Sequence, residues 1–131
     1  MQEYTSAKSS IKQIPAGFNI VDKYFGWQPN TINFDIGGGK YDLMSEKLLE
    51  KGVTNYIYDP YNRLPKYNFR SLLKAMYCSD TVTIFNVLNV IKEREVQINV
   101  LKLAYIALKH DGYVYVRSTY MNPNKRSGVT K

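Results

Sequence analysis

The chain contains few of the residues that build disulfides or metal centres. Among its 131 residues there is one cysteine, Cys78, and one histidine, His110. A single cysteine cannot form a disulfide within the chain, and this favours a reducing compartment, so we expect a cytoplasmic protein. Metal sites need several ligands at suitable spacing, which one cysteine and one histidine do not supply. We therefore expect no metal, and we expect Cys78 to be a buried thiol.

Long apolar runs are also missing. No stretch approaches the roughly 18 apolar residues of a membrane helix, and the opening residues MQEYTSAKSS lack the apolar segment of a secretory signal. We expect no membrane contact. Basic residues outnumber acidic ones by 18 to 11, but they are spread along the chain rather than clustered as in nucleic-acid binders. We interpret the net charge of +7 as a solvated surface, with only weak support for a nucleic-acid partner.

The remaining residues suffice for one domain with one hydrophobic core. We expect an N-terminal arm over residues 1–15, a domain over 16–120 and a loose tail over 121–131. Apolar periodicity predicts four helices and four strands. The helices are expected at 16–25, 42–51, 68–77 and 92–109, and the strands at 31–36, 54–59, 80–85 and 113–120. This alternation predicts an α/β fold with a parallel sheet in the order 2-1-3-4 and helices on both faces.

The apolar pattern also predicts which side chains are buried. In the second expected helix we expect Met44, Leu48 and Leu49 to form the buried stripe. In the third helix the expected buried residues are Phe69, Leu72, Leu73 and Met76. His110, Asp111 and Gly112 are expected to form a surface turn before the last strand.

The most informative segment is TINFDIGGGKYD, residues 31–42, in which an apolar run with Asp35 is followed by three glycines. Glycines at the carboxyl end of a buried strand let a ligand approach the backbone. Asp59 ends the next strand-like run, 24 residues after Asp35, where an acid can hold ribose hydroxyls. The pattern predicts a nucleoside-containing cofactor. The simpler alternatives are a tight turn at the glycines and a turn-forming role for Asp59 before Pro60.

Two cofactor classes fit this segment poorly. A P-loop needs Ser or Thr after its lysine, and Tyr41 follows Lys40. A dinucleotide fingerprint needs a third glycine at position 42, which is Asp42, and its carboxylate would repel a pyrophosphate. A cofactor with a positive centre and no phosphate fits better.

A family resemblance leads to the same kind of cofactor. The string FDIGGG, residues 34–39, resembles the first motif of class I S-adenosylmethionine-dependent methyltransferases. Asp59 is similar to their ribose-binding acid, TIFNVLNVI at 83–91 to the strand and loop beside the cofactor, and KHDGYVYV at 109–116 to the turn into their fifth strand. The resemblance covers residues 16–120, and DIGGGKYD, YDPYNR and NVLNVI look most like small methyltransferase-like proteins of bacteriophages and bacteria.

The resemblance implies a Rossmann-like core, S-adenosylmethionine as cofactor and methyl transfer to an acceptor that the sequence does not identify. The residues that it implies for cofactor binding are Asp35, Gly37, Gly38, Gly39, Asp59, Pro60, Tyr61, Asn62, Asn86 and Val87. Tyr61 or Asn62 would line the adenine pocket, and Asn86 or Asn89 would contact the substrate. No catalytic residue is assigned, since methyl transfer can proceed largely by positioning.

The chain departs from the family pattern in the size of its sheet. One strand between the second and third is missing, and the two strands that normally follow residue 120 have no counterpart. We therefore expect a truncated sheet with an exposed edge at 113–120, and either a homodimer or aggregation through that edge. Two alternatives stay open: a non-catalytic protein that binds S-adenosylmethionine or S-adenosylhomocysteine, and a basic, nucleic-acid-associated adaptor with a purely structural glycine loop.

Overall fold

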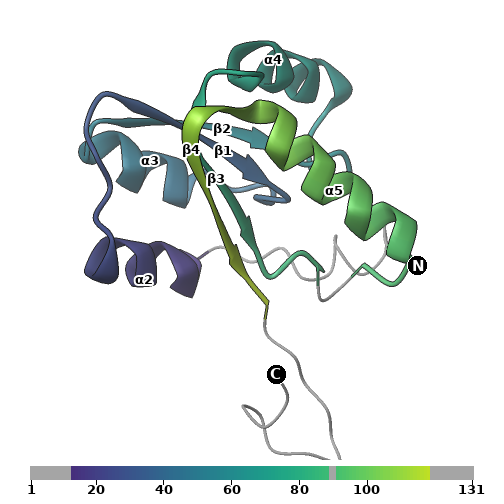
Figure 1. The fold of residues 1–131 in the computed structure, drawn as a ribbon, viewed down its shortest axis with the longest axis horizontal. Helices are drawn as coiled ribbons and strands as arrows, with labels where there is room; N and C mark the ends of the chain where they lie inside the picture. The colour runs from purple at the N-terminus through teal and green to yellow at the C-terminus, as the bar shows by residue number, and fades with distance from the viewer. Residues whose placement is uncertain (1–12, 89–90, 119–131) are drawn as a thin grey trace, which may run out of the picture.

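The computed structural model describes residues 13–88 and 91–118 (Figure 1). In chain order the elements are α2 (Ala16–Tyr24), β1 (Thr31–Ile36), α3 (Leu43–Glu50), β2 (Val53–Tyr58), α4 (Pro65–Ala75), β3 (Ser79–Phe85), α5 (Arg94–Ala107) and β4 (Leu108–Arg117). Residues 1–12 of the predicted arm, Asn89 and the predicted tail over 121–131 lie outside the described residues.

The four strands form one parallel sheet in the order β2-β1-β3-β4. This confirms the predicted α/β class and strand order, and the arrangement is compatible with a Rossmann-like fold. β1 lies in the middle and its last four residues are all buried. A parallel sheet that is covered on both faces requires such a strand, which explains the compact apolar run in the sequence.

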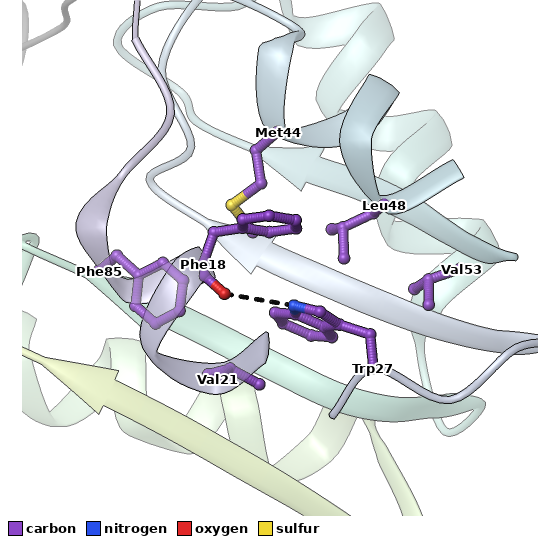
Figure 2. Close-up of a cluster of buried hydrophobic side chains, with 7 residues drawn as sticks. All are labelled: Phe18, Val21, Trp27, Met44, Leu48, Val53 and Phe85. Atoms are coloured by element: carbon purple, nitrogen blue, oxygen red, sulfur yellow. Dashed lines mark hydrogen bonds between the residues drawn. The ribbon is translucent and has the colours of Figure 1, made fainter. Parts of the chain in front are cut away.

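Helices cover both faces of the sheet, as predicted (Figure 1). On one face α2 and α3 pack around stacked rings of Phe18 and Trp27, whose centroids are 5.7 Å apart. The indole Nε1 of Trp27 donates a hydrogen bond of 3.3 Å to the Phe18 carbonyl (Figure 2). On the other face α4 and α5 pack on Phe34, Ile36, Val82 and Ile84. The helix between β1 and β2 and the helix between β2 and β3 thus lie on opposite faces of the sheet, as expected when crossovers of the same hand run in opposite directions from β1 and β2.

The predicted buried stripe of α4 is wrong for Phe69 and Leu73, whereas Leu72 and Met76 pack against the core. Phe69 and Leu73 are 61% and 65% exposed, while Asn68, Ser71 and Ala75 are buried. Leu72 and Met76 are half-buried. The small inner residues Ser71 and Ala75 leave room for close packing of the helix on the sheet. Asn68 faces inward because its side-chain amide forms hydrogen bonds with the backbone of the loop after β2. In α3, Met44 and Leu48 are buried as predicted, but Leu49 is exposed.

The predicted turn at His110–Gly112 is also wrong. α5 ends at Ala107 and β4 begins at the next residue, so these residues belong to the strand. The register between β3 and β4 shifts at this point: Ser79 pairs with Leu108, whereas Thr81 pairs with Tyr113. The inserted residues form an irregular stretch opposite Asp80, which the Lys109 ammonium holds at 2.8 Å. Cys78, which precedes β3, is exposed and not buried.

Candidate functional site

A cavity of about 250 Å³ lies at the carboxyl ends of β1, β2 and β3. The chain passes from β1 to β2 on one side, and β3 lies on the other, so the topological switch point is here. Open parallel sheets bind ligands at this point. Eight of the ten predicted cofactor-binding residues line the cavity: Asp35, Gly37, Gly38, Gly39, Asp59, Asn62, Asn86 and Val87.

The glycine turn is shaped by the protein's own packing. Gly37 and Gly39 have φ of +74° and +83°, a region that favours glycine. A Cβ on Gly37 would lie 2.5 Å from Cγ2 of Val87, and one on Gly38 would lie 2.4 Å from Oδ2 of Asp35. Close packing therefore requires Gly37 and Gly38 independently of any ligand, as the tight-turn alternative held.

The carboxylate of Asp59 joins this turn to the loop after β2. Its Oδ2 accepts hydrogen bonds from the Gly39 amide at 2.8 Å and from Nδ2 of Asn62 at 2.9 Å. Its Oδ1 accepts from the backbone amides of Tyr61 and Asn62 at 3.1 and 3.2 Å. A carboxylate has about four acceptor positions, so these four donors use them all. Three of the donors are backbone amides. The fourth is the side-chain amide of Asn62, which another hydrogen-bond donor could replace.

Asn68 fixes the backbone on either side of this carboxylate. Its Oδ1 accepts from the Asp59 amide at 2.8 Å, and its Nδ2 donates to the carbonyls of Asp59 at 3.2 Å and Arg63 at 3.1 Å. The amide of a buried Asn can satisfy both a donor and acceptors, which an apolar residue at this position cannot. Sequence reasoning missed Asn68 because it expected an apolar inner face.

Arg63, in the loop after β2, ties this loop to the glycine turn. Its Nε donates to the Gly39 carbonyl at 2.8 Å, and its Nη2 donates to the Tyr41 carbonyl at 3.1 Å and to Oδ1 of Asp42 at 2.7 Å. The guanidinium also lies 4.6 Å from the centre of the Tyr67 ring. Arg63 thus compensates the Asp42 charge, so the expected repulsion between Asp42 and a pyrophosphate is weaker than the sequence argument assumed.

Asp35 is buried in a polar layer within the sheet. Its Oδ1 accepts a hydrogen bond of 2.8 Å from the Thr83 hydroxyl, which in turn accepts one from the Asn33 amide at 3.0 Å. Burial raises the pKa of Asp35 to about 7, against the opposing hydrogen bond from Thr83, and the Asp59 carboxylate contributes to the rise. Asp35 therefore changes its charge near neutral pH.

The polar layer continues away from the cavity. Asn33 also donates to Oδ1 of Asn55 at 2.8 Å, and Asn55 donates to the Ser45 hydroxyl at 2.9 Å. These residues were not predicted. Their signal in the sequence is that Asn33 and Asp35 alternate with apolar residues in a strand that is buried on both faces.

A second, largely apolar cavity of about 220 Å³ lies on the α5 side of the same strand ends. Pro60 and Tyr61, the other two predicted residues, line it together with Val100 and Leu103 of α5. The two cavities share Gly37, Asp59 and Val87. The contact between Val87 and Gly37 therefore lies where the two cavities meet.

Other candidate groups lie away from the cavities. His110 is exposed on β4, and neither it nor Cys78 lines either cavity. Within residues 13–88 and 91–118, no three His, Cys, Asp or Glu side chains come close enough to hold a metal ion. None of the helices in these ranges combines the length and the apolar character that a membrane span needs.

Comparison of the chain with protein-family models, with curated proteins and with solved structures finds no match. What the protein binds is therefore inferred from the geometry of the site.

Proposed function

We propose that the protein binds S-adenosylmethionine at the strand-end cavities and transfers its methyl group to an acceptor. The observation that carries this proposal is the cavity at the switch point, where the glycine turn meets two buried acids, Asp35 and Asp59. This position in a parallel sheet suits a nucleoside ligand.

The charges around the cavity favour a cation. Asp35 and Asp59 line it, and none of the described residues that line it is a lysine or an arginine. Arg63 directs its donors to the neighbouring loop carbonyls and to Asp42. A phosphate in the cavity would meet two acids and no cation among the lining residues, whereas a sulfonium and an amino group would be attracted.

Asp59 and Asn62 give the site a means of accepting a ribose. Asn62 would release Oδ2 of Asp59, and this oxygen would then accept a hydrogen bond from a ribose hydroxyl. The backbone amides of Gly39, Tyr61 and Asn62 would keep the carboxylate in place. The apolar cavity beside Tyr61 and Leu103 would receive the base.

Asp35 would balance the positive charge of the methionine part. A bound cofactor would supply an activated methyl group, and the chain's contribution is to hold it in line with the acceptor. Asp35 must lose its proton to stabilise a cation, so the proposal couples binding to proton release. Affinity should rise about tenfold per pH unit below pH 7 and level off above it.

Calorimetric titration of the full chain with S-adenosylmethionine and S-adenosylhomocysteine tests the proposal. We expect both to bind the wild type and Asp59→Asn to lose at least about tenfold in affinity, because the amide cannot accept all four hydrogen bonds. Asp22→Asn is the matched control, since Asp22 is an exposed acid on α2 that pairs with Lys51. If neither ligand binds the folded wild type, the proposal is wrong.

Binding without methyl transfer is the second candidate. It is favoured by the sheet, which in the described residues ends at β4. Incubation with methyl-tritiated cofactor and separate pools of protein, nucleic acid and small molecules distinguishes the two. Label in one pool supports the transferase, and binding without label in any pool supports the non-catalytic alternative.

A further inference from the structure

The apolar cavity beside α5 contains a polar side chain to which the proposed function gives no role. The face of α5 that lines this cavity consists of Val96, Asn99, Val100 and Leu103. Residues at these spacings share one face of a helix, so the Asn99 carboxamide lies in a row of apolar side chains. An amide in such a row needs a hydrogen-bond partner once a ligand excludes water.

A neighbouring amide on α5 has a structural role, and Asn99 differs from it. Nε2 of Gln97 donates hydrogen bonds to the carbonyls of Leu88 at 3.1 Å and of Ile91 at 2.7 Å, which tie the segment before α5 to the helix. Within residues 13–88 and 91–118, the side chain of Asn99 has no hydrogen-bond partner. The fold therefore uses the amide of Gln97, whereas the amide of Asn99 is left for a ligand in the cavity.

We infer that Asn99 determines which base the apolar cavity accepts, by pairing its carboxamide with a purine that carries a 6-amino group. This inference rests on the proposed function, because it concerns the base of the same cofactor. A carboxamide presents an acceptor and a donor group side by side. The 6-amino group of adenine donates and the nearby ring nitrogen accepts, so one Asn side chain can pair with both.

The other polar side chains that line this cavity suit the task less well. The Asp59 carboxylate only accepts hydrogen bonds, and the loops around it already use its four acceptor positions. Tyr58 and Tyr61 also line the cavity, but a phenol offers one hydrogen-bonding group where the edge of adenine offers two. Among the described lining residues, Asn99 is therefore the one whose side chain matches both groups.

The exposure of Asn99 explains how one amide can discriminate between bases. Asn99 is exposed and Val100 beside it is half-buried, which places the amide at the open side of the cavity. Water hydrates an amide at such a position in the free protein, and a base that enters the cavity displaces this water. A base without the 6-amino group does not replace the lost hydrogen bonds, so it should bind more weakly.

Calorimetric titration with two ligands tests the role of Asn99. The probes are S-adenosylhomocysteine and its analogue in which hydrogen replaces the 6-amino group. We expect the wild type to bind the analogue about tenfold more weakly. Asn99→Leu keeps the size of the side chain but removes both hydrogen-bonding groups, so the difference should shrink to less than about threefold. The loss should fall on S-adenosylhomocysteine, while the affinity for the analogue stays nearly unchanged.

Asn19→Leu is the matched control, because Asn19 is an exposed residue of α2 that lines neither cavity. This variant should keep the wild-type difference between the two ligands. Asn99→Ala is a second variant and should lose that difference as Asn99→Leu does. If the wild type binds neither ligand, the proposed function is wrong and the inference is wrong with it. If the wild type binds S-adenosylhomocysteine but both Asn99 variants keep the wild-type difference, or the wild type binds both ligands equally, the inference alone is wrong.

Discussion

The ends of β1 and β2 each carry a buried acid, yet the two carboxylates are held in different ways. Asp59 at the end of β2 accepts four hydrogen bonds, three of them from backbone amides. Asp35 in β1 accepts a hydrogen bond from the Thr83 hydroxyl, and burial raises its pKa to about 7. The comparison indicates that Asp59 organises the loops at the strand ends, while the raised pKa of Asp35 makes its charge sensitive to pH.

Removal of Asp59 should have the largest effect. Asp59→Ala leaves buried amides of the glycine turn and the β2 loop without an acceptor, and we expect a loss on the order of 4 kcal/mol in the free energy of unfolding. Urea denaturation measures this loss. Asp22→Ala, at an exposed ion pair with Lys51, should cost less than about 1 kcal/mol. Equal losses for the two variants would mean that Asp59 does not organise the turn.

The packing of the glycine turn gives the next effect. Gly37→Ala forces a side chain into positive φ and against Val87, and we expect a loss of about 2–3 kcal/mol. Gly26, with φ of +82°, has the same backbone requirement, but a Cβ there would meet only Gln28 at 3.6 Å. Gly26→Ala should therefore cost about 1 kcal/mol. If Val87→Ala does not reduce the cost of Gly37→Ala in a double-mutant cycle, the close contact is not its cause.

Asp35 should make stability depend on pH. Its pKa is raised on folding, so between the unfolded value of 3.8 and about 7 the native state holds a proton that the unfolded state has lost. Its contribution to stability is therefore lost as pH rises through this window. The free energy of unfolding of Asp35→Asn, relative to that of the wild type, should increase by on the order of 2 kcal/mol between pH 5 and pH 8. A difference between the two proteins that stays constant with pH would contradict the raised pKa.

Arg63 links the two strand ends, and its replacement should have the smallest effect. Arg63→Lys keeps the charge near Asp42 but cannot reach the carbonyls of Gly39 and Tyr41 with a planar fork. We expect a loss of about 1 kcal/mol in thermal unfolding. Arg70→Lys, at an exposed position of α4, is the control, and the prediction fails if both changes cost the same.

Much of the fold could be predicted because local sequence patterns indicate where its helices and strands begin and end. The apolar run of β1, the glycines after it and Gly52 after α3 mark the element boundaries, and the alternation of elements then determines the strand order. The inner face of α4 could not be read in this way. Phe69 and Leu73 are among the most apolar residues of the helix, but they are exposed, whereas Asn68 is buried. Asn68 forms hydrogen bonds to Asp59 and Arg63 in the loop before the helix, and such contacts do not follow helical periodicity.

The site shows the same division. Its predicted residues come together because strand ends in a parallel sheet share one edge. The clamp by Arg63 and the layer of Asn33, Asn55 and Thr83 depend on side chains from different strands that meet in space. Such contacts leave no spacing rule in one sequence, so the sequence predicted which residues meet at the strand ends but not how their charges are balanced.

The most direct test of the central claim is a nuclear magnetic resonance titration of the 15.2 kDa chain with S-adenosylmethionine. Backbone amide shifts report which residues sense the ligand. The account predicts saturable shifts concentrated at Gly37–Gly39, Asn62 and Asn86, and the same pattern weakened in Asp59→Asn. Absence of shifts, or shifts confined to residues outside the two cavities, would contradict it.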